Sequence, residues 1–306
     1  MAKTFIPEEF RHKFTGLFGN ESEEFFRYCA IKQPKSIWIN SLKIRPELLF
    51  DDLSKKGWKL RQLFHENAFS LEGIDRPGQS EEFGKGLFNV QEKASMIPAI
   101  ALDPKPGETV LDAAAAPGNK TLQLACLMNG KGKLVAVEKN VQRFKSLRFN
   151  IEKFGMRSVI AKRMDLLDAK KNGVFDRVLL DAPCSSEGLV RKDFDALKGW
   201  SEELVLKKSE LQKKMILKAF DLLKEGGTLV YSTCSLSPEE DEEVVDHLLR
   251  QGGARVEKIK IESFRLREGL GEYNGKAYDP NVRNCTRIYP QDNDSQGFFV
   301  ARIKKN

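Results

Sequence analysis

The sequence of 306 residues has no apolar run close to the roughly 18 residues that cross a bilayer, so we expect no membrane-spanning helix. Its first ten residues, MAKTFIPEEF, lack the apolar segment and cleavage site of a secretory signal. Internal repeats and low-complexity tracts are also missing. We therefore expect a globular, cytoplasmic protein, and we expect it to be a monomer.

Cysteine and histidine are both scarce. Five cysteines are an odd number and form no C-x-x-C pair, which fits neither a disulfide framework nor a zinc site. The three histidines lie far apart among polar neighbours, at His12, His65 and His247. We therefore expect free thiols and no metal site.

Charge of one sign is only slightly in excess. Lys and Arg number 51 against 44 Asp and Glu, which gives a net charge of +7. A basic balance favours polyanionic partners such as nucleic acids, but it does not establish one.

What is present, between about residues 108 and 235, is an alternation of short apolar segments with longer amphipathic ones. This pattern is typical of successive βαβ units, and it predicts a doubly wound, Rossmann-like α/β sheet. The predicted strands, each apolar enough to be buried on both faces, are 109–113, 134–138, 159–164, 177–181 and 228–233. The predicted helices are 120–128, 141–154 and 202–223, the last of them ended by Gly226-Gly227.

The segments after residue 235 are predicted to extend this sheet, and those before the sheet to form a separate domain. We predict a helix that begins at Ser237-Pro238-Glu239-Glu240, followed by a last strand over 298–303 that completes the sheet. Residues 1–95 are predicted to form a small N-terminal α+β domain, and residues 96–306 the catalytic domain. Within the first, 1–33 is helical, 36–72 is a β-α-β unit and 73–95 is a linker.

The first predicted strand of the large domain runs into a loop of small residues, Asp112 to Thr121, at the edge where such sheets bind ligands. The loop has a single glycine, so it matches neither the dinucleotide pattern G-x-G-x-x-G nor a P-loop. Four successive strands end in acidic residues: Asp112, Glu138, Asp165 and Asp181. Carboxylates accept hydrogen bonds from ribose hydroxyls, attract a cationic group and repel phosphates. The pattern favours S-adenosylmethionine over NAD.

Two cysteines follow the fourth and fifth strands. Cys184 lies in the segment DAPCSS and Cys234 in the segment STCSL, so both are expected to face one cleft. A thiolate is a soft nucleophile that can add to carbon 6 of a pyrimidine, which activates carbon 5 for methylation. Their spacing leaves open which of the two attacks.

These segments resemble motifs of the Sun (Fmu) and nucleolar-protein family of RNA (cytosine-5)-methyltransferases. The resemblance covers roughly residues 36–304 and includes the segments DAAAAPGNKT, DAPCSS and TCS, together with FNVQEKAS before the loop and GFF near the end. It implies a class I methyltransferase that uses S-adenosylmethionine. It is closest to the compact archaeal members that act on tRNA, and ribosomal RNA remains the alternative substrate.

Individual roles follow from the resemblance alone. It implies that Cys234 is the nucleophile, that Cys184 assists product release and that Asp181 contacts the target base. It assigns the cofactor to Ala114, Ala115, Ala116, Pro117, Gly118, Asn119, Lys120, Glu138, Asp165 and Asp181. The chain departs from the family motifs at Ala114, Asn119 and Ser186, which stand for Cys, Gly and Gly. Asn119 is expected to take a left-handed conformation in place of the glycine.

Positive charge follows the first of the two cysteines. Arg191 and Lys192 resemble the family's basic loop, and we expect them to contact RNA. Lysines on the next predicted helix are interpreted as a solvated face. Lys35, Lys43, Arg45 and Asn40 of the N-terminal domain are expected to extend the RNA groove. Two other functions stay open: a methyltransferase for DNA cytosine or a small molecule, and a non-catalytic RNA-binding assembly factor.

Overall fold

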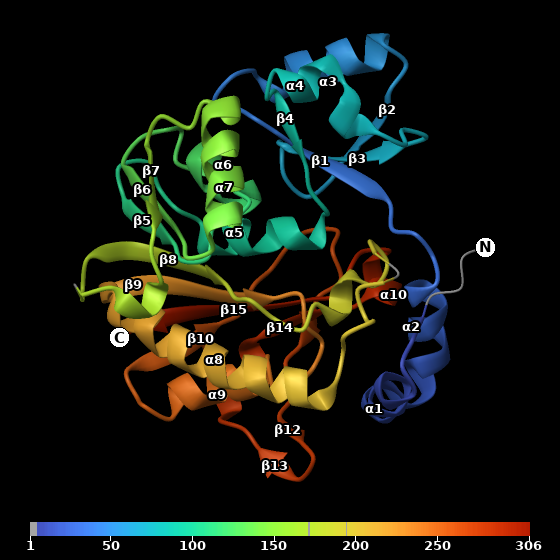
Figure 1. Cartoon of the computed structure of the whole chain (residues 1–306), viewed down its shortest axis with the longest axis vertical. Coiled ribbons are helices and arrows are strands. Elements are labelled where there is room, and N and C mark those ends of the chain that lie inside the picture. Colours follow the sequence, from blue (N-terminus) through green and yellow to red (C-terminus); the bar gives the residue numbers. More distant parts are fainter. Residues whose placement is uncertain (1–4, 171, 194) are drawn as a thin grey trace.

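Two β-sheets organise the chain in the computed structural model, which describes residues 5–170, 172–193 and 195–306 (Figure 1). The smaller of the two is antiparallel, with the strand order β2-β3-β1-β4. The larger one is mixed, with the order β11-β14-β15-β9-β8-β5-β6-β7 and β10 paired to β15, and β12 and β13 form a separate two-stranded ribbon. None of the helices in the described ranges has the length and apolarity that a membrane crossing requires.

The first part of the chain forms short elements. They are α1 (Glu8–Phe18), α2 (Ser22–Cys29), β1 (Lys35–Ile39), α3 (Pro46–Lys55), β2 (Lys59–Gln62), β3 (Ala68–Glu72), α4 (Glu81–Gly84) and β4 (Phe88–Val90). The segment 73–95, which the sequence predicted to be a linker, therefore contains a helix and a strand. Its apolar Phe88 and Val90 form the strand β4, which pairs with Ile39 and Ile37 of β1.

The second part contains the large sheet and its helices. They are α5 (Ile97–Leu102), β5 (Thr109–Asp112), α6 (Asn119–Leu127), β6 (Lys133–Glu138), α7 (Val141–Phe154), β7 (Val159–Arg163), β8 (Phe175–Asp181), α8 (Glu202–Asp221), β9 (Leu223–Thr233), α9 (Glu242–Leu249), β10 (Ala254–Glu257), β11 (Arg267–Glu268), β12 (Glu272–Tyr273), β13 (Lys276–Ala277), β14 (Thr286–Ile288), α10 (Pro290–Asn293) and β15 (Phe298–Lys305). Strands β7, β6, β5, β8 and β9 are parallel, and β15 is antiparallel to β9.

Helices cover both faces of the large sheet, as the doubly wound prediction requires (Figure 1). Apolar side chains of α8 and α9, such as Ile216 and Val245, share one buried cluster with Leu180 and Tyr231 of the central strands. Residues of α5 and α6 share a second cluster with strand residues on the opposite face. The predicted fold class, with a small domain before it, is confirmed.

Three local predictions were wrong. Gly226-Gly227 do not end α8, because β9 already begins at Leu223, which pairs with Phe175 of β8. The two glycines lie inside β9, where its pairing with β8 is irregular. The segment after Ser237 turns first and becomes helical only at Glu242. Strand β7 is not buried on both faces, since it lies at the edge of the sheet and leaves Ile160 exposed.

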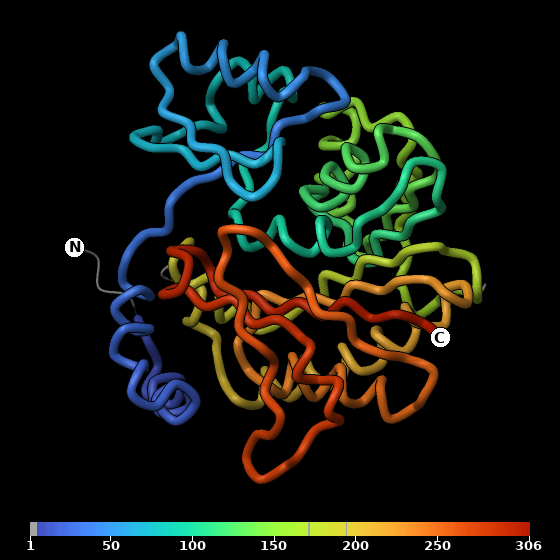
Figure 2. The backbone as a smooth tube through the Cα atoms, turned by 180° about the vertical axis from the view of Figure 1, so that it is seen from behind, coloured from blue at the N-terminus to red at the C-terminus, as the bar shows by residue number. Residues whose placement is uncertain are grey.

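Helices α1 and α2 lie apart from the small sheet, beside the large one (Figures 1 and 2). Phe10, Phe14 and Phe25 pack with Trp200 and Leu197, which belong to the segment before α8. The helical segment that the sequence grouped with the N-terminal domain therefore packs on the large domain, because its apolar face is aromatic and matches the apolar side chains there.

Candidate functional site

The loop after β5 has the geometry of a ligand-binding turn. Gly118 has a φ of 109°, in the left-handed region, and a Cβ there would lie 3.2 Å from the Leu147 side chain. Asn119 begins helix α6 with right-handed backbone, so the left-handed conformation expected of it falls on Gly118 instead. The other departure, Ser186, does adopt a positive φ, of 65°.

A cavity of about 430 Å³ opens at the carboxyl ends of the parallel strands. We call it the strand-end cavity, and its lining includes Ala114, Glu138, Asp165, Asp181, Cys184 and Cys234. These residues lie at or just after the carboxyl ends of five neighbouring strands, β5 to β9, as the sequence pattern predicted. Three flanking residues that no motif indicated, Lys139, Arg143 and Lys208, also border it.

The carboxylates at this edge are not equivalent. Glu138 accepts a hydrogen bond from the backbone N–H of Asn140 at 2.7 Å, and its second oxygen lies 3.5 Å from the Arg143 guanidinium. Asp165 caps a short turn by accepting from the N–H of Leu167 at 3.1 Å, and its other oxygen meets Lys139. Both carboxylates still border the strand-end cavity.

Asp112 differs from the other three, because it does not reach the cavity. It is buried and accepts a hydrogen bond from the Thr121 hydroxyl at 2.7 Å, and burial raises its pKa to about 7. The expectation of four carboxylates around the ligand is therefore corrected to three. Asp112 instead ties the end of β5 to α6 and shapes the loop between them.

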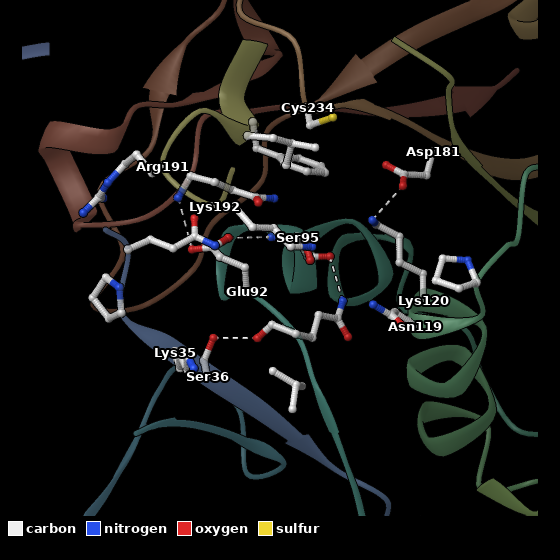
Figure 3. A pocket seen from close by; sticks show the side chains of 18 of the residues that line it. Lys35, Ser36, Glu92, Ser95, Asn119, Lys120, Asp181, Arg191, Lys192 and Cys234 are labelled. Atoms are coloured by element: carbon white, nitrogen blue, oxygen red, sulfur yellow. Dashed lines mark hydrogen bonds and ion pairs between the residues drawn. The ribbon is translucent and has the colours of Figure 1, made fainter. Parts of the chain in front are cut away.

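A second cavity of about 410 Å³ lies between the two sheets (Figure 3). We call it the inter-sheet cavity, and its lining includes Lys35, Gln91, Glu92, Lys120, Lys192 and Phe298. The predicted cofactor loop is divided between the two cavities, since Ala116, Pro117, Asn119 and Lys120 border this second one and Ala114 the first. Ala115 and Gly118 border neither cavity.

Asp181 and Cys234 border both cavities. Asp181 accepts hydrogen bonds from the Lys120 ammonium at 2.7 Å (Figure 3) and from the Ser232 hydroxyl at 2.8 Å. The two bonds fix both carboxylate oxygens, so the side chain is oriented before any ligand enters. The wall that the two cavities share therefore includes a fixed carboxylate and a thiol.

Cys184 and Cys234 meet at the ends of β8 and β9. Their sulfur atoms lie 3.0 Å apart, although 50 residues separate them in the sequence. All five cysteines are free, and the other three are buried in packed regions. The hydrogen bond with Cys234, followed by burial, raises the pKa of Cys184 well above its usual range. Cys184 is therefore held as a thiol, beside a second sulfur that reaches both cavities.

The two residues expected to contact RNA differ sharply. Arg191 is buried, and its guanidinium donates to the carbonyls of Ile31 and Ser295, at 2.9 and 2.8 Å, and to Asp294 at 2.5 Å. The Arg191 guanidinium is therefore engaged in internal hydrogen bonds rather than free for a phosphate, although the residue also lines the inter-sheet cavity. Lys192 is exposed and borders the inter-sheet cavity.

Two N-terminal residues expected in the RNA groove donate hydrogen bonds to backbone carbonyls; Asn40 is buried, whereas Lys43 stays exposed. Asn40 donates to the carbonyls of Gly86 and Phe154, and Lys43 donates to those of Lys85 and Lys153. They fasten the small sheet to the end of α7. Lys35 does border the inter-sheet cavity. The described part of the chain has no group of three or more His, Cys, Asp or Glu side chains suited to a metal ion.

Known proteins share this architecture and sequence. The family described as 16S rRNA methyltransferase RsmB/F matches residues 99–304, and the N-terminal domain of 16S rRNA methyltransferase RsmF matches residues 6–93. A crystal structure described as a methyltransferase homolog protein from Pyrococcus horikoshii is 33% identical, with a TM-score of 0.86 and coverage of 98% of this chain and 96% of that one. A further Pyrococcus horikoshii structure, described as NSun6 with SFG, is 24% identical with a TM-score of 0.86, covers 98% of each chain and shows the shared fold.

Two named relatives are each 40% identical. A tRNA (cytosine(49)-C(5))-methyltransferase of Pyrococcus abyssi aligns over 94% of this chain and 93% of its own length. Ribosomal RNA small subunit methyltransferase F of Vibrio vulnificus aligns over 99% of this chain, which spans 65% of that relative's length. The chain belongs to the RsmB/F, or Sun/Fmu, family of RNA methyltransferases.

Proposed function

We propose that the protein methylates carbon 5 of a cytosine in RNA, with S-adenosylmethionine as methyl donor and Cys234 as nucleophile. The observation that carries this proposal is that Cys234 and Asp181 border both cavities. A thiol in that position can reach a base held on one side while a methyl donor is bound on the other.

The strand-end cavity suits S-adenosylmethionine. Glu138 ends β6, where a carboxylate can accept hydrogen bonds from both ribose hydroxyls, and Asp165 and Asp181 add negative charge that favours a sulfonium over a phosphate. When bound, this cofactor supplies an electrophilic methyl group. The Pyrococcus horikoshii relative carries SFG, an analogue of S-adenosylmethionine, which supports the same ligand class here.

The inter-sheet cavity suits the target base. The Cys234 thiolate would add to carbon 6 of the cytosine, and the electron pair of the 5,6 double bond would then form the new bond from carbon 5 to the methyl group. The bond from that methyl group to the donor sulfonium would break at the same time and leave a neutral thioether. Asp181 is fixed by Lys120 and Ser232, and it is placed to contact the ring while the thiolate adds. Loss of the carbon 5 proton restores the double bond and releases the Cys234 sulfur, a step that the neighbouring Cys184 assists.

RNA is proposed to follow the basic and polar wall of the inter-sheet cavity. Lys35, Gln91 and Lys192 place two cations and an amide along it, and the first two come from the N-terminal domain. Ammonium groups neutralise phosphates, and a base that is flipped out of its stack can then enter the cavity. We thus propose that residues 1–95 contribute to RNA binding and residues 96–306 to catalysis.

We propose tRNA as the substrate. Nearly the whole Pyrococcus abyssi tRNA methyltransferase has a counterpart in this chain, whereas about a third of the Vibrio vulnificus ribosomal RNA methyltransferase has none within residues 1–306. Ribosomal RNA is the second candidate, supported by the matches to RsmF and its N-terminal domain.

Transfer of a labelled methyl group tests the proposal. Purified protein is incubated with labelled S-adenosylmethionine and equal amounts of unmodified tRNA, 16S ribosomal RNA and single-stranded DNA, and bisulfite sequencing then locates 5-methylcytosine. We expect label in tRNA only. Label in 16S RNA alone selects the second candidate, label in DNA assigns another class of methyltransferase, and label in none of the three supports a non-catalytic binding factor.

A further inference from the structure

The loops that carry the two cysteines are fastened to each other by buried carboxylates. Glu187 comes three residues after Cys184, yet all of its hydrogen bonds go to other segments. Its Oε2 accepts from the backbone N–H groups of Leu236 and Ser237, each at 2.8 Å, and from the Ser235 hydroxyl at 2.9 Å. The carboxylate of the first loop therefore binds the backbone of the second.

A second carboxylate belongs to the loop after Cys234 and binds the loop after Cys184. Glu240 follows Cys234, and both of its oxygens accept from the backbone N–H of Ser185, at 3.2 and 3.0 Å. Its Oε2 also accepts from the amide of Gln212 at 2.7 Å. Glu187 and Glu240 are both fully buried, so each loop holds the other by a contact that water does not weaken.

The hydroxyl of Ser235 stands between the two carboxylates. It lies 2.9 Å from Glu187 and 3.1 Å from Glu240. A hydroxyl has one proton, so Ser235 can donate to only one of the two carboxylates. The other carboxylate must hold a proton of its own to complete a hydrogen bond with Ser235.

The surroundings decide which carboxylate is the charged one. Besides the two backbone N–H groups, Glu187 accepts from the indole N–H of Trp200 at 2.7 Å and from the Ser237 hydroxyl at 2.6 Å. Each of its oxygens thus faces a group that can only donate. Glu240 has Ser235 as a possible acceptor, and burial together with the charge of Glu187 raises the pKa of Glu240 to about 7.

We propose that Glu187, as a carboxylate, and Glu240, as a neutral acid, form a clasp through Ser235 that positions Cys184 against Cys234. Both acids are positioning residues, since neither borders the cavities. Only the catalytic role of the clasp rests on the proposed function, because the clasp sets the distance between the two sulfurs whether or not RNA is methylated.

The equilibrium between the two thiols and a disulfide measures their proximity. Oxidised glutathione converts the pair to a disulfide and becomes two molecules of reduced glutathione, so atoms and electrons balance. The full-length protein is equilibrated without oxygen in buffers of fixed glutathione ratio, free thiols are alkylated, and mass spectrometry quantifies the Cys184–Cys234 bond. Neither RNA nor cofactor is needed, so a failure of the methylation assay leaves this test intact.

Three substitutions separate the members of the clasp. In Glu187→Gln the amide nitrogen must face either backbone N–H groups or the Trp200 indole, and we expect the disulfide equilibrium constant to fall about tenfold, a shift of about 30 mV. In Glu240→Gln the amide N–H can donate to the Ser235 oxygen, as the hydroxyl of a neutral acid does, so the disulfide equilibrium constant should stay within about twofold of that of the unsubstituted protein. Glu240→Ala removes this donor, and the constant should fall about tenfold. In methylation assays Glu187→Gln should lower kcat and leave the KM for RNA unchanged.

Ser235→Ala is the milder variant if Glu187→Gln does not fold, and it should lower the equilibrium constant about threefold. Glu82→Gln, a buried acid of α4 that pairs with Lys56, is the control for loss of a buried carboxylate and should leave the constant unchanged. Unaltered constants in the Glu187 or Ser235 variants would overturn the clasp. Equal losses in Glu240→Gln and Glu240→Ala would overturn the neutral state of Glu240, and failure of the unsubstituted pair to oxidise would overturn the proximity itself.

Discussion

The ammonium group of Lys120 lies 2.7 Å from one carboxylate oxygen of Asp181, and this contact joins the first turn of α6 to the end of β8. The lysine is largely buried, with 12% of its side chain exposed, against 31% for the aspartate. Because Asp181 borders both cavities, this ion pair stands where the base and the methyl donor are proposed to meet.

We predict that Lys120 and Asp181 act as a unit. Lys120→Met and Asp181→Asn should each lower kcat, and the double variant should lose less than the sum, with a coupling of about 0.5–3 kcal/mol. Single-turnover methylation measures it. Lys224→Met, which breaks an ion pair with Asp176 away from both cavities, is the control. Strictly additive losses would show that the ion pair has no part in the reaction.

The cofactor site makes a separate prediction. Glu138→Ala and Asp165→Ala remove charged acceptors, and each should weaken S-adenosylmethionine binding by about 1.5–3 kcal/mol. Glu138 should show the larger effect because only 5% of its side chain is exposed, against 31% for Asp165. Calorimetry measures both. Asp168→Ala, an exposed acid three residues along that does not border the cavity, should change nothing. If all three variants bind S-adenosylmethionine as tightly as the unsubstituted protein, the strand-end cavity is not the cofactor site.

The convergence of the strand ends could be predicted from sequence because it depends on local patterns. Apolar segments ending in Glu138, Asp181 or Thr233 predict parallel strands, and parallel strands place their carboxyl ends at one edge. That rule alone brought Cys184 and Cys234 together. Their separation of 3.0 Å, by contrast, depends on how the following loops are fastened.

Buried charge was the feature that sequence patterns could not predict. Arg191 stands in a basic segment that resembles a phosphate-binding loop, yet the carbonyls that it binds belong to Ile31 and Ser295, which are 160 and 104 residues away. Glu240 was expected in the first turn of a helix, and it is instead buried and hydrogen-bonded to the loop after Cys184. In both cases the partner is distant in sequence, so no local spacing reveals it.

The basic loop yields a prediction with a built-in control. Lys192→Ala should weaken RNA binding and lower the slope of log affinity against log salt by about one, because one phosphate contact releases its counterion. Arg191→Ala should instead destabilise the fold, since it leaves buried carbonyls without a donor, at a cost of about 1–3 kcal/mol. Filter binding over a salt series and urea denaturation separate the two. A salt slope unchanged in Lys192→Ala would leave that lysine as solvated surface.

The central claim is that Cys234 attacks the base and Cys184 assists its release, and trapping of the protein–RNA adduct on a denaturing gel tests it most directly. Unsubstituted protein should form a stable adduct only with RNA that contains 5-fluorocytosine, whose carbon 5 has no proton to lose. With ordinary RNA and S-adenosylmethionine, Cys184→Ala should accumulate a nuclease-sensitive shifted band, because addition proceeds and elimination is slowed. Cys234→Ala should show no band and no methylation with either RNA. A band in Cys234→Ala and none in Cys184→Ala would exchange the two roles and contradict the account.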